Sequence, residues 1–300
     1  MNIEKIKKQK IGVLYGGSST EREVSLKSGK AVFNSLKKMK FNVCLIDIKN
    51  NAAKKISQAK IDIAFPVLHG RGGEDGAIQG FLETINLPYI GCGIFASAAS
   101  MDKNITKQIL ASADIKTPKW ICLTKGDPIK KISYPVVVKP VNGGSTVGIS
   151  ICKNQKELDA ALETAFKYDT EAIIEQFIKG TEITVAVLNG KTLPIIEIIA
   201  ESGFYDFEAK YKKGASRHII PARISAAAAK TANNYAKKIY EVFNCRPICR
   251  ADMIVDKKNN VWVLENNTSP GLTETSLVPD AARACGISFD DLMIKLLESL

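Results

Sequence analysis

Residues 249–267 read CRADMIVDKKNNVWVLENN, a stretch that predicts two antiparallel strands joined by a turn. Apolar and β-branched residues flank the polar quartet 257–260, which is typical of a β-hairpin. If the quartet is the loop, the pairs follow by counting: Asp256 with Val261, Asp252 with Glu265, and Arg250 with Asn267. Because side chains alternate between the two faces of a strand, the four residues of the last two pairs share one face.

Two carboxylates, those of Asp252 and Glu265, would lie directly opposite one another and repel. A divalent cation held by Asp252, Glu265 and Asn267 would remove this repulsion, because Mg²⁺ takes oxygen ligands. A solvated polar face without an ion fits the same pattern. The hairpin alone leaves both interpretations open.

Composition narrows the class of protein. The chain has 300 residues, 45% of them hydrophobic and 24% charged, with a net charge of +11, which is ordinary for a globular protein of two or three domains. No apolar run has the roughly 18–20 residues of a membrane span, and the lysines are spread out without interleaved aromatic residues. We therefore expect no membrane and no nucleic-acid partner. The charged start lacks the apolar core of a secretory signal, and the seven scattered cysteines favour the cytoplasm.

The first part of the chain alternates between strand and helix patterns. Strands are predicted at Ile11–Tyr15, Val43–Ile48 and Ile61–Phe65, with helices at Leu26–Lys38 and Ala77–Ile85. This rhythm predicts a parallel sheet covered by helices, with ligands at the carboxyl ends of the strands.

The rest of the chain follows two further patterns. A helix at Met101–Ala113 leads into strands and a helix up to residue 176, and a third unit ends with helix Ala226–Phe243, the hairpin and helix Phe289–Ser299. We predict an α/β fold of three domains: an N-terminal parallel-sheet βαβ domain (1–97), a central domain (98–181) and a C-terminal domain (182–300).

Two loops follow strands of the first unit. Thr20 and Glu23 have the spacing of a capping box, which leaves Glu21 available to bind an ammonium group. His69 precedes the glycine-rich run 70–76. The pattern fits a structural role and a functional role of His69 equally well.

Later loops also have two interpretations each. Residues 142–146 contain Gly143-Gly144 after Lys139, and they can cradle phosphate oxygens or form a simple turn. Glu175 and Glu182 suit an adenine and ribose pocket or an ordinary linker. The basic segment 212–218, which ends in His218, is predicted to be a mobile loop. The Gly271 amide can donate to a developing oxyanion.

Six motifs in order along the chain resemble those of D-alanine–D-alanine ligases. They are Gly16-Gly17 with Glu21–Ser25, His69–Gly76, Met101–Lys103, 204–211 (FYDFEAKY), Glu265–Gly271 and Ser276–Pro279. The resemblance covers essentially the whole chain, and the six motifs together are far more specific than any one of them.

The resemblance implies an ATP-grasp architecture that joins two D-alanines through an acyl phosphate, for peptidoglycan precursor synthesis. ATP would lie between the central and C-terminal units with two Mg²⁺ ions, for which Mn²⁺ is an alternative. The metal ligands would be Asp252, Glu265 and Asn267. The nucleotide would be bound by Lys103, Lys139, Glu175, Glu182 and Lys210.

The same resemblance assigns the amino-acid sites and a homodimeric state. Glu21 would hold the first D-alanine with His69 nearby, and Ser276 would bind the carboxylate of the second. Glu21, Ser145 and Tyr211 would form a hydrogen-bonded set that fixes the closing loop. Arg250 and Gly271 would stabilise the oxyanion.

Two features bear on the alternatives. Gly143 stands where many members have Glu, and Tyr211, rather than Phe, resembles the members that use D-alanine. Remaining alternatives are a ligase with D-lactate or D-serine as second substrate, and a non-catalytic nucleotide-binding protein on the same scaffold.

Overall fold

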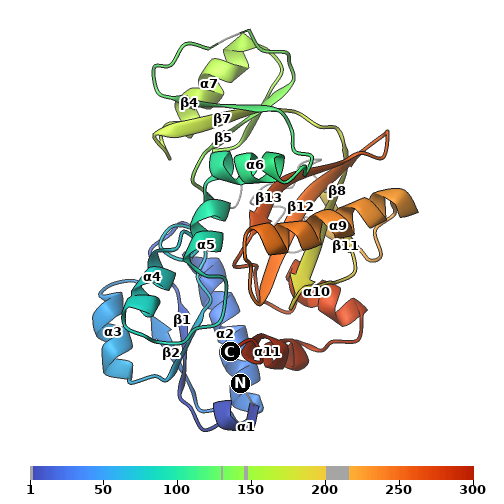
Figure 1. Cartoon of the computed structure of the whole chain (residues 1–300). Coiled ribbons are helices and arrows are strands. Elements are labelled where there is room, and N and C mark those ends of the chain that lie inside the picture. The colour runs from blue at the N-terminus through green and yellow to red at the C-terminus, as the bar shows by residue number, and fades with distance from the viewer. Residues whose placement is uncertain (1–2, 130, 145–147, 201–215) are drawn as a thin grey trace.

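The computed structural model describes residues 3–129, 131–144, 148–200 and 216–300, and it contains three sheets (Figure 1). The predicted roles of Ser145, Lys210 and Tyr211 therefore concern positions outside the described residues. The first two sheets lie in the ranges 1–97 and 98–181, and the third lies in 182–300 except that its strand β8 begins at Gly180. As domain boundaries, these three ranges stay a prediction.

The first sheet is parallel, as predicted, with the strand order β2-β1-β3. Its strands are nearly continuous apolar runs, because helices cover both faces of such a sheet. The elements of this unit are α1 (Ile3–Ile6), β1 (Ile11–Tyr15), α2 (Arg22–Lys38), β2 (Val43–Asp47), α3 (Ala52–Ala59), β3 (Ile63–Pro66) and α4 (Ala77–Thr84).

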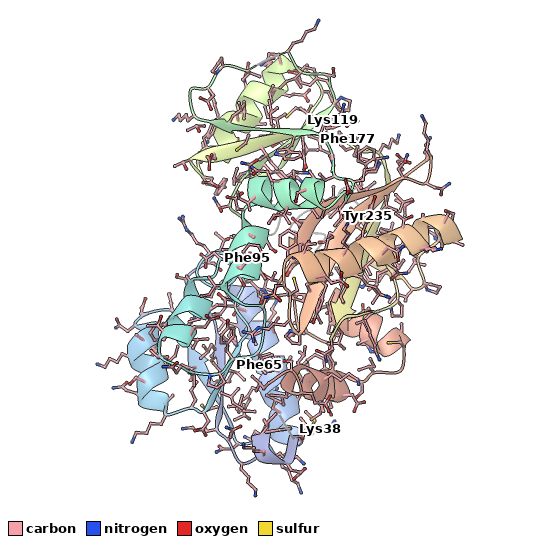
Figure 2. All side chains as sticks on the ribbon, viewed as in Figure 1. Lys38, Phe65, Phe95, Lys119, Phe177 and Tyr235 are labelled. Carbon is pink, nitrogen blue, oxygen red and sulfur yellow. The ribbon has the colours of Figure 1, made fainter. Side chains whose placement is uncertain are left out.

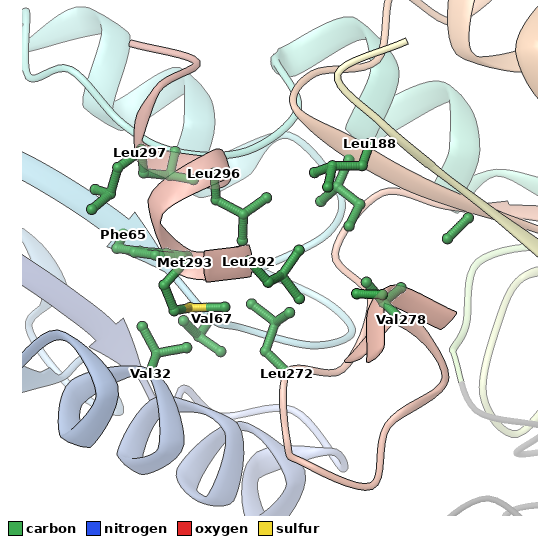
Figure 3. Close-up of a cluster of buried hydrophobic side chains, with 14 of the residues drawn as sticks. Val32, Phe65, Val67, Leu188, Leu272, Val278, Leu292, Met293, Leu296 and Leu297 are labelled. Atoms are coloured by element: carbon green, nitrogen blue, oxygen red, sulfur yellow. The ribbon is translucent and has the colours of Figure 1, made fainter. Parts of the chain in front are cut away.

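One face of the first sheet shares its hydrophobic core with the end of the chain. Helix α11 (Phe289–Leu297) packs against α2, and Met293 and Leu296 are buried together with Val32 and Phe65 (Figure 3). This core therefore contains elements from both ends of the chain, and this face of the first sheet does not have a core made of the first unit's own residues alone.

The central sheet is antiparallel, with the order β4-β7-β5-β6, and α7 lies along it (Figure 1). Its elements are β4 (Trp120–Thr124), β5 (Val136–Pro140), β6 (Ser150–Cys152), α7 (Gln155–Ala165) and β7 (Glu171–Gln176).

The C-terminal sheet has the order β11-β10-β8-β12-β13, with β9 paired to β8, and α9 packs on it. Its elements are β8 (Gly180–Leu188), β9 (Lys191–Thr192), β10 (Ile196–Ala200), β11 (Ser216–Ile219), α9 (Ala226–Val242), β12 (Ile248–Asp256), β13 (Val261–Asn267) and α10 (Leu277–Ala284). The prediction of a loop at His218 is wrong, since His218 lies in β11 and pairs with Ile198.

The helix predicted at Met101–Ala113 is present as a single helix, but it begins two residues later than predicted, at Lys103. Helix α5 (Ile94–Met101) ends before Asp102, which has extended backbone angles and accepts a hydrogen bond from the Ile105 amide (2.8 Å) as the N-cap of α6 (Lys103–Ser112). The cap turns the chain so that Lys103 donates its backbone amide to the Val141 carbonyl (3.2 Å). Aspartate favours this position because its carboxylate pairs with amides of the first helical turn.

The hairpin register is confirmed at one end and wrong at the other. Arg250 pairs with Asn267 and Asp252 with Glu265, but Val261 pairs with Val255 instead of Asp256. A β-bulge at Leu264 absorbs the extra residue, and the burial of β13 changes phase there. The bulge keeps Val261 and Val263 in the core and turns Glu265 and Asn267 towards the polar side.

Figure 2 labels Phe65 in the first unit and Phe95 on α5, and their side chains are 2% and 56% exposed. Within the described ranges, no helix combines the length and apolar character needed to cross a membrane.

Candidate active site

A cavity of about 1090 Å³ lies where loops of all three sheets meet. Eight of the site residues that the resemblance assigns line it: Glu21, His69, Lys103, Arg250, Glu265, Asn267, Gly271 and Ser276. Four others, Lys139, Glu175, Glu182 and Asp252, do not contribute to its lining. The fold therefore brings together residues that are more than 250 positions apart in the sequence.

Glu21 is buried at the start of α2. The predicted capping box of Thr20 and Glu23 is wrong, because the N-cap is Glu21 and no side chain caps the helix. The backbone carbonyl of Glu21 accepts hydrogen bonds from the amides of Val24 (3.0 Å) and Ser25 (3.1 Å). Its carboxylate is thus not used as a cap and faces the cavity lining.

Glycines of two loops approach the Glu21 carboxylate. A methyl group on Gly70 would lie 3.0 Å from Glu21 Oε2, and one on Gly144 would overlap the same oxygen. The absence of side chains at these positions lets the first and central units close on one carboxylate.

The loop that carries Glu21 is held by an ion pair. The Arg22 guanidinium donates to both carboxylate oxygens of Asp47 (2.9 and 2.6 Å) and to the Gly17 carbonyl (2.9 Å). The hydrogen bond from Arg22 lowers the pKa of Asp47 to about 2. A lowered pKa means that the charged form of Asp47 is stabilised in the folded protein.

We expect Asp47→Asn to lower the free energy of unfolding at neutral pH, because it removes this pairing. The folded pKa of about 2 lies below the ordinary value of 3.8, so the wild-type advantage is complete above about pH 4 and disappears as the pH falls towards 2. Urea unfolding of both proteins at several pH values measures it. A difference that stays constant down to the lowest pH would contradict the assignment.

His69 is buried between two carboxylates. Its Nδ1 lies 3.6 Å from Glu74 Oε1, and burial lowers its pKa while Glu74 and Glu21 raise it, with a net increase. Its Nε2 is buried and has no hydrogen-bond partner within the described ranges. His69 is therefore positioned to form a hydrogen bond with a polar group in the cavity, and it does not serve only as part of the hydrophobic core.

Asp252 is already paired within its own strand. Arg250 donates to it through Nε (2.9 Å) and Nη2 (2.7 Å), and the Thr184 hydroxyl donates to Oδ1 (2.6 Å). Arg250 thus relieves part of the repulsion between Asp252 and Glu265 that the sequence suggested. The case for a metal depends instead on the donors: two carboxylates and the Asn267 amide at adjacent register positions, a set that fits Mg²⁺.

The other end of the cavity is formed by the N-terminus of α10. Ser276 is its N-cap, and the Ser276 Oγ accepts a hydrogen bond from the Thr273 amide (3.1 Å). A methyl group on Gly271 would lie 3.0 Å from that Oγ, so the two residues are neighbours. The first amides of a helix favour a carboxylate or phosphate.

Lysines from the central unit complete the arrangement. The Lys103 ammonium donates to the Gly143 carbonyl (2.5 Å), which fixes it beside the loop of paired glycines. Lys139 is ion-paired with Glu175, and Glu182 lies on β8 opposite Ile254.

Two residues of the site region were missed from the sequence. Lys107 contacts Glu175, and Thr184 contacts Asp252. The spacing of Lys107 from Lys103 on one helix was a usable signal. Thr184 has no signal of its own, because it lies within an apolar strand.

Comparisons with known proteins agree with this arrangement. Residues 109–298 match the family model of the D-ala D-ala ligase C-terminus, and residues 10–58 and 49–92 match that of the N-terminus. A D-alanine–D-alanine ligase of Carboxydothermus hydrogenoformans is 45% identical over 96% of this chain and 97% of the relative.

Solved structures give the same result. The D-alanine–D-alanine ligase of Bacillus anthracis complexed with ATP has a TM-score of 0.86 at 35% identity, covering 97% of both chains. The VanG D-Ala:D-Ser ligase of Enterococcus faecalis has a TM-score of 0.82 at 32% identity, covering 97% of this chain and 98% of the other. These matches confirm the α/β fold class and define the chain as a ligase. It belongs to the D-alanine–D-alanine ligase family.

Proposed function

We propose that the protein joins two D-alanine molecules in an ATP-dependent reaction that supplies a peptidoglycan precursor. The observation that carries this proposal is the single cavity lined by Glu21, Lys103, Arg250, Glu265 and Ser276. Family membership supports the same reaction, and so does the ATP complex of the Bacillus anthracis relative. The cytoplasm as location and a homodimer as assembly belong to the proposal as well.

The first D-alanine binds with its ammonium at Glu21. Glu21 is a buried carboxylate that lies against the glycines of two loops, which leave room for a small cationic substrate. This orientation directs the carboxylate of the first D-alanine towards the lysines and the hairpin, where ATP phosphorylates that carboxylate. Phosphorylation is required because a carboxylate itself is a poor electrophile.

The second D-alanine binds with its carboxylate at Ser276 and the N-terminus of α10. Its amine then attacks the acyl phosphate to form a tetrahedral oxyanion, which collapses to the peptide bond as inorganic phosphate leaves and the nitrogen loses a proton. The Arg250 guanidinium and the Gly271 amide stabilise that charge, and a single donor of this kind is typically worth about 2.7–4 kcal/mol. A water-free cavity protects the acyl phosphate from hydrolysis.

Nucleotide binding depends on the positive groups of the central unit. Lys103, Lys139 and the amides around Gly143-Gly144 neutralise and position the phosphates, with Glu175 and Glu182 on the rest of the nucleotide. The resemblance assigns Lys210 to the phosphates, and Tyr211 and Ser145 to a set with Glu21 that fixes the closing loop. Asp252, Glu265 and Asn267 would hold Mg²⁺, which supplies further neutralisation of phosphate charge when bound.

The experiment that tests the proposal is phosphate release from ATP with each D- and L-amino acid in turn, together with D-lactate. We expect release with D-alanine, and D-alanyl-D-alanine as the product. ATP binding without release by any substrate would support a non-catalytic nucleotide-binding protein instead. If phosphate release is faster with D-alanine plus D-serine than with D-alanine alone, the protein would be a D-Ala:D-Ser ligase, like the Enterococcus faecalis relative.

A further inference from the structure

A buried set of three charged residues lies between α6 and the central sheet. Glu175 on β7 is 2% exposed and contacts the ammonium groups of Lys107 (2.7 Å) and Lys139. The two lysines come from α6 and β5, so the three side chains belong to three different elements. Lys107 is among the most deeply buried large side chains of the described residues, at 1% exposure.

The two lysines are held very differently. The Lys107 ammonium also donates to the Thr117 hydroxyl (2.8 Å) and to the Pro118 carbonyl (3.5 Å), and it lies 5.7 Å from the ring centre of Trp120. Among the residues that the structure describes, Glu175 is the one hydrogen-bond or ion-pair partner of Lys139. Lys107 is therefore held in place by several contacts. Lys139 can move to another partner if it gives up its contact with Glu175.

The pKa shifts of the three groups show that both lysines act on Glu175. Burial raises the pKa of Glu175, but Lys139 and Lys107 outweigh it and hold the pKa at about 2. Burial lowers the pKa of Lys139, but the opposite effect of Glu175 is larger, so the pKa is raised overall. Burial dominates at Lys107 and lowers its pKa. A buried carboxylate left without a cation would be strongly unfavourable, so Lys139 can leave Glu175 only if Lys107 stays.

We propose that Lys107 is a positioning residue for the nucleotide: it keeps Glu175 charged and in place when the Lys139 ammonium moves from Glu175 to the phosphates of ATP. This inference depends on the proposed function, because it takes ATP as the ligand of Lys139. Lys107 itself does not touch the nucleotide. Without it, Glu175 retains Lys139, and the phosphates lose one cation.

The test compares the affinity for ATP with that for adenosine, measured by titration calorimetry on the full chain. We expect Lys107→Met to weaken ATP binding by about tenfold or more, since a lost charged contact has this size, and to leave adenosine binding unchanged. In a Glu175→Gln background, the same substitution should have little further effect on ATP binding, because Lys139 is already released. Lys156→Met, at an exposed position on α7, is the matched control.

The outcomes separate the inference from a structural role and from the proposed function. Equal losses for ATP and adenosine, or an undiminished loss in the Glu175→Gln background, would show that Lys107 only supports the fold. Wild-type ATP affinity in Lys107→Met would overturn the inference and leave the proposed function standing. A wild-type protein that binds no ATP would instead reject the proposed function. If Lys107→Met does not fold, Lys107→Gln, which can still donate to Thr117, replaces it with the same expectation.

Discussion

Replacement of Glu265 by Gln is expected to reduce the rate of D-alanyl-D-alanine formation by at least about a hundredfold, because metal ligation supplies several kcal/mol to the transition state. Glu265 lies opposite Asp252 at the edge of the cavity. The amide of Gln has nearly the same shape but carries no charge, so the neutralisation of phosphate charge is lost while the packing is preserved. Product formation at saturating ATP and D-alanine measures the effect.

The fold of the Glu265→Gln variant should be unchanged, since the side chain is only partly buried. Circular dichroism and thermal unfolding check this. Glu163→Gln, the same substitution at an exposed position on α7, is the control and should keep wild-type activity. Wild-type turnover by Glu265→Gln would remove Glu265 from the metal site.

Replacement of Arg250 by Met is expected to lower the free energy of unfolding by about 3–5 kcal/mol, as for other broken buried ion pairs. Arg250 and Asp252 are 7% and 6% exposed, and the substitution leaves the Asp252 charge buried opposite Glu265. Ligation should be lost as well, because Arg250 is the proposed donor to the oxyanion. Urea unfolding at neutral pH gives the first effect, and the product assay gives the second.

A second substitution separates the stability effect from simple loss of packing. Asp252→Asn added to Arg250→Met removes the buried charge that Arg250 had paired and should restore part of the stability without restoring activity. Arg283→Met breaks an exposed pair with Asp280 and should cost no more than about 1 kcal/mol. If the double variant is no more stable than Arg250→Met, the buried charge is not the cause.

Much of the fold followed from local patterns in the sequence. The alternation from Ile11 to Ile85 was enough to predict a parallel sheet, since strand and helix periodicities differ and each is set by near neighbours. The helix predicted at Met101–Ala113 begins at Lys103 for a local reason as well, because Asp102 is its N-cap.

The part of the candidate site that lies on a single β-hairpin could be predicted from the sequence. Arg250, Asp252, Glu265 and Asn267 share a face because strands alternate, and that conclusion survived the error at the turn. The bulge at Leu264 could not be predicted, because it arises from competition between core packing of Val263 and the polar side of Glu265.

By itself, the sequence determined which side chains alternate on one face, where glycines permit close approach, and which residue types are available for charge. Tertiary structure alone decided that Arg250 neutralises Asp252, that Gly144 lies against Glu21, and that Lys107 and Lys139 share Glu175. The physical reason is one of range. Periodicity and capping act over a few residues, whereas an ion pair in a low-dielectric interior depends on which distant segments the folded core brings into contact.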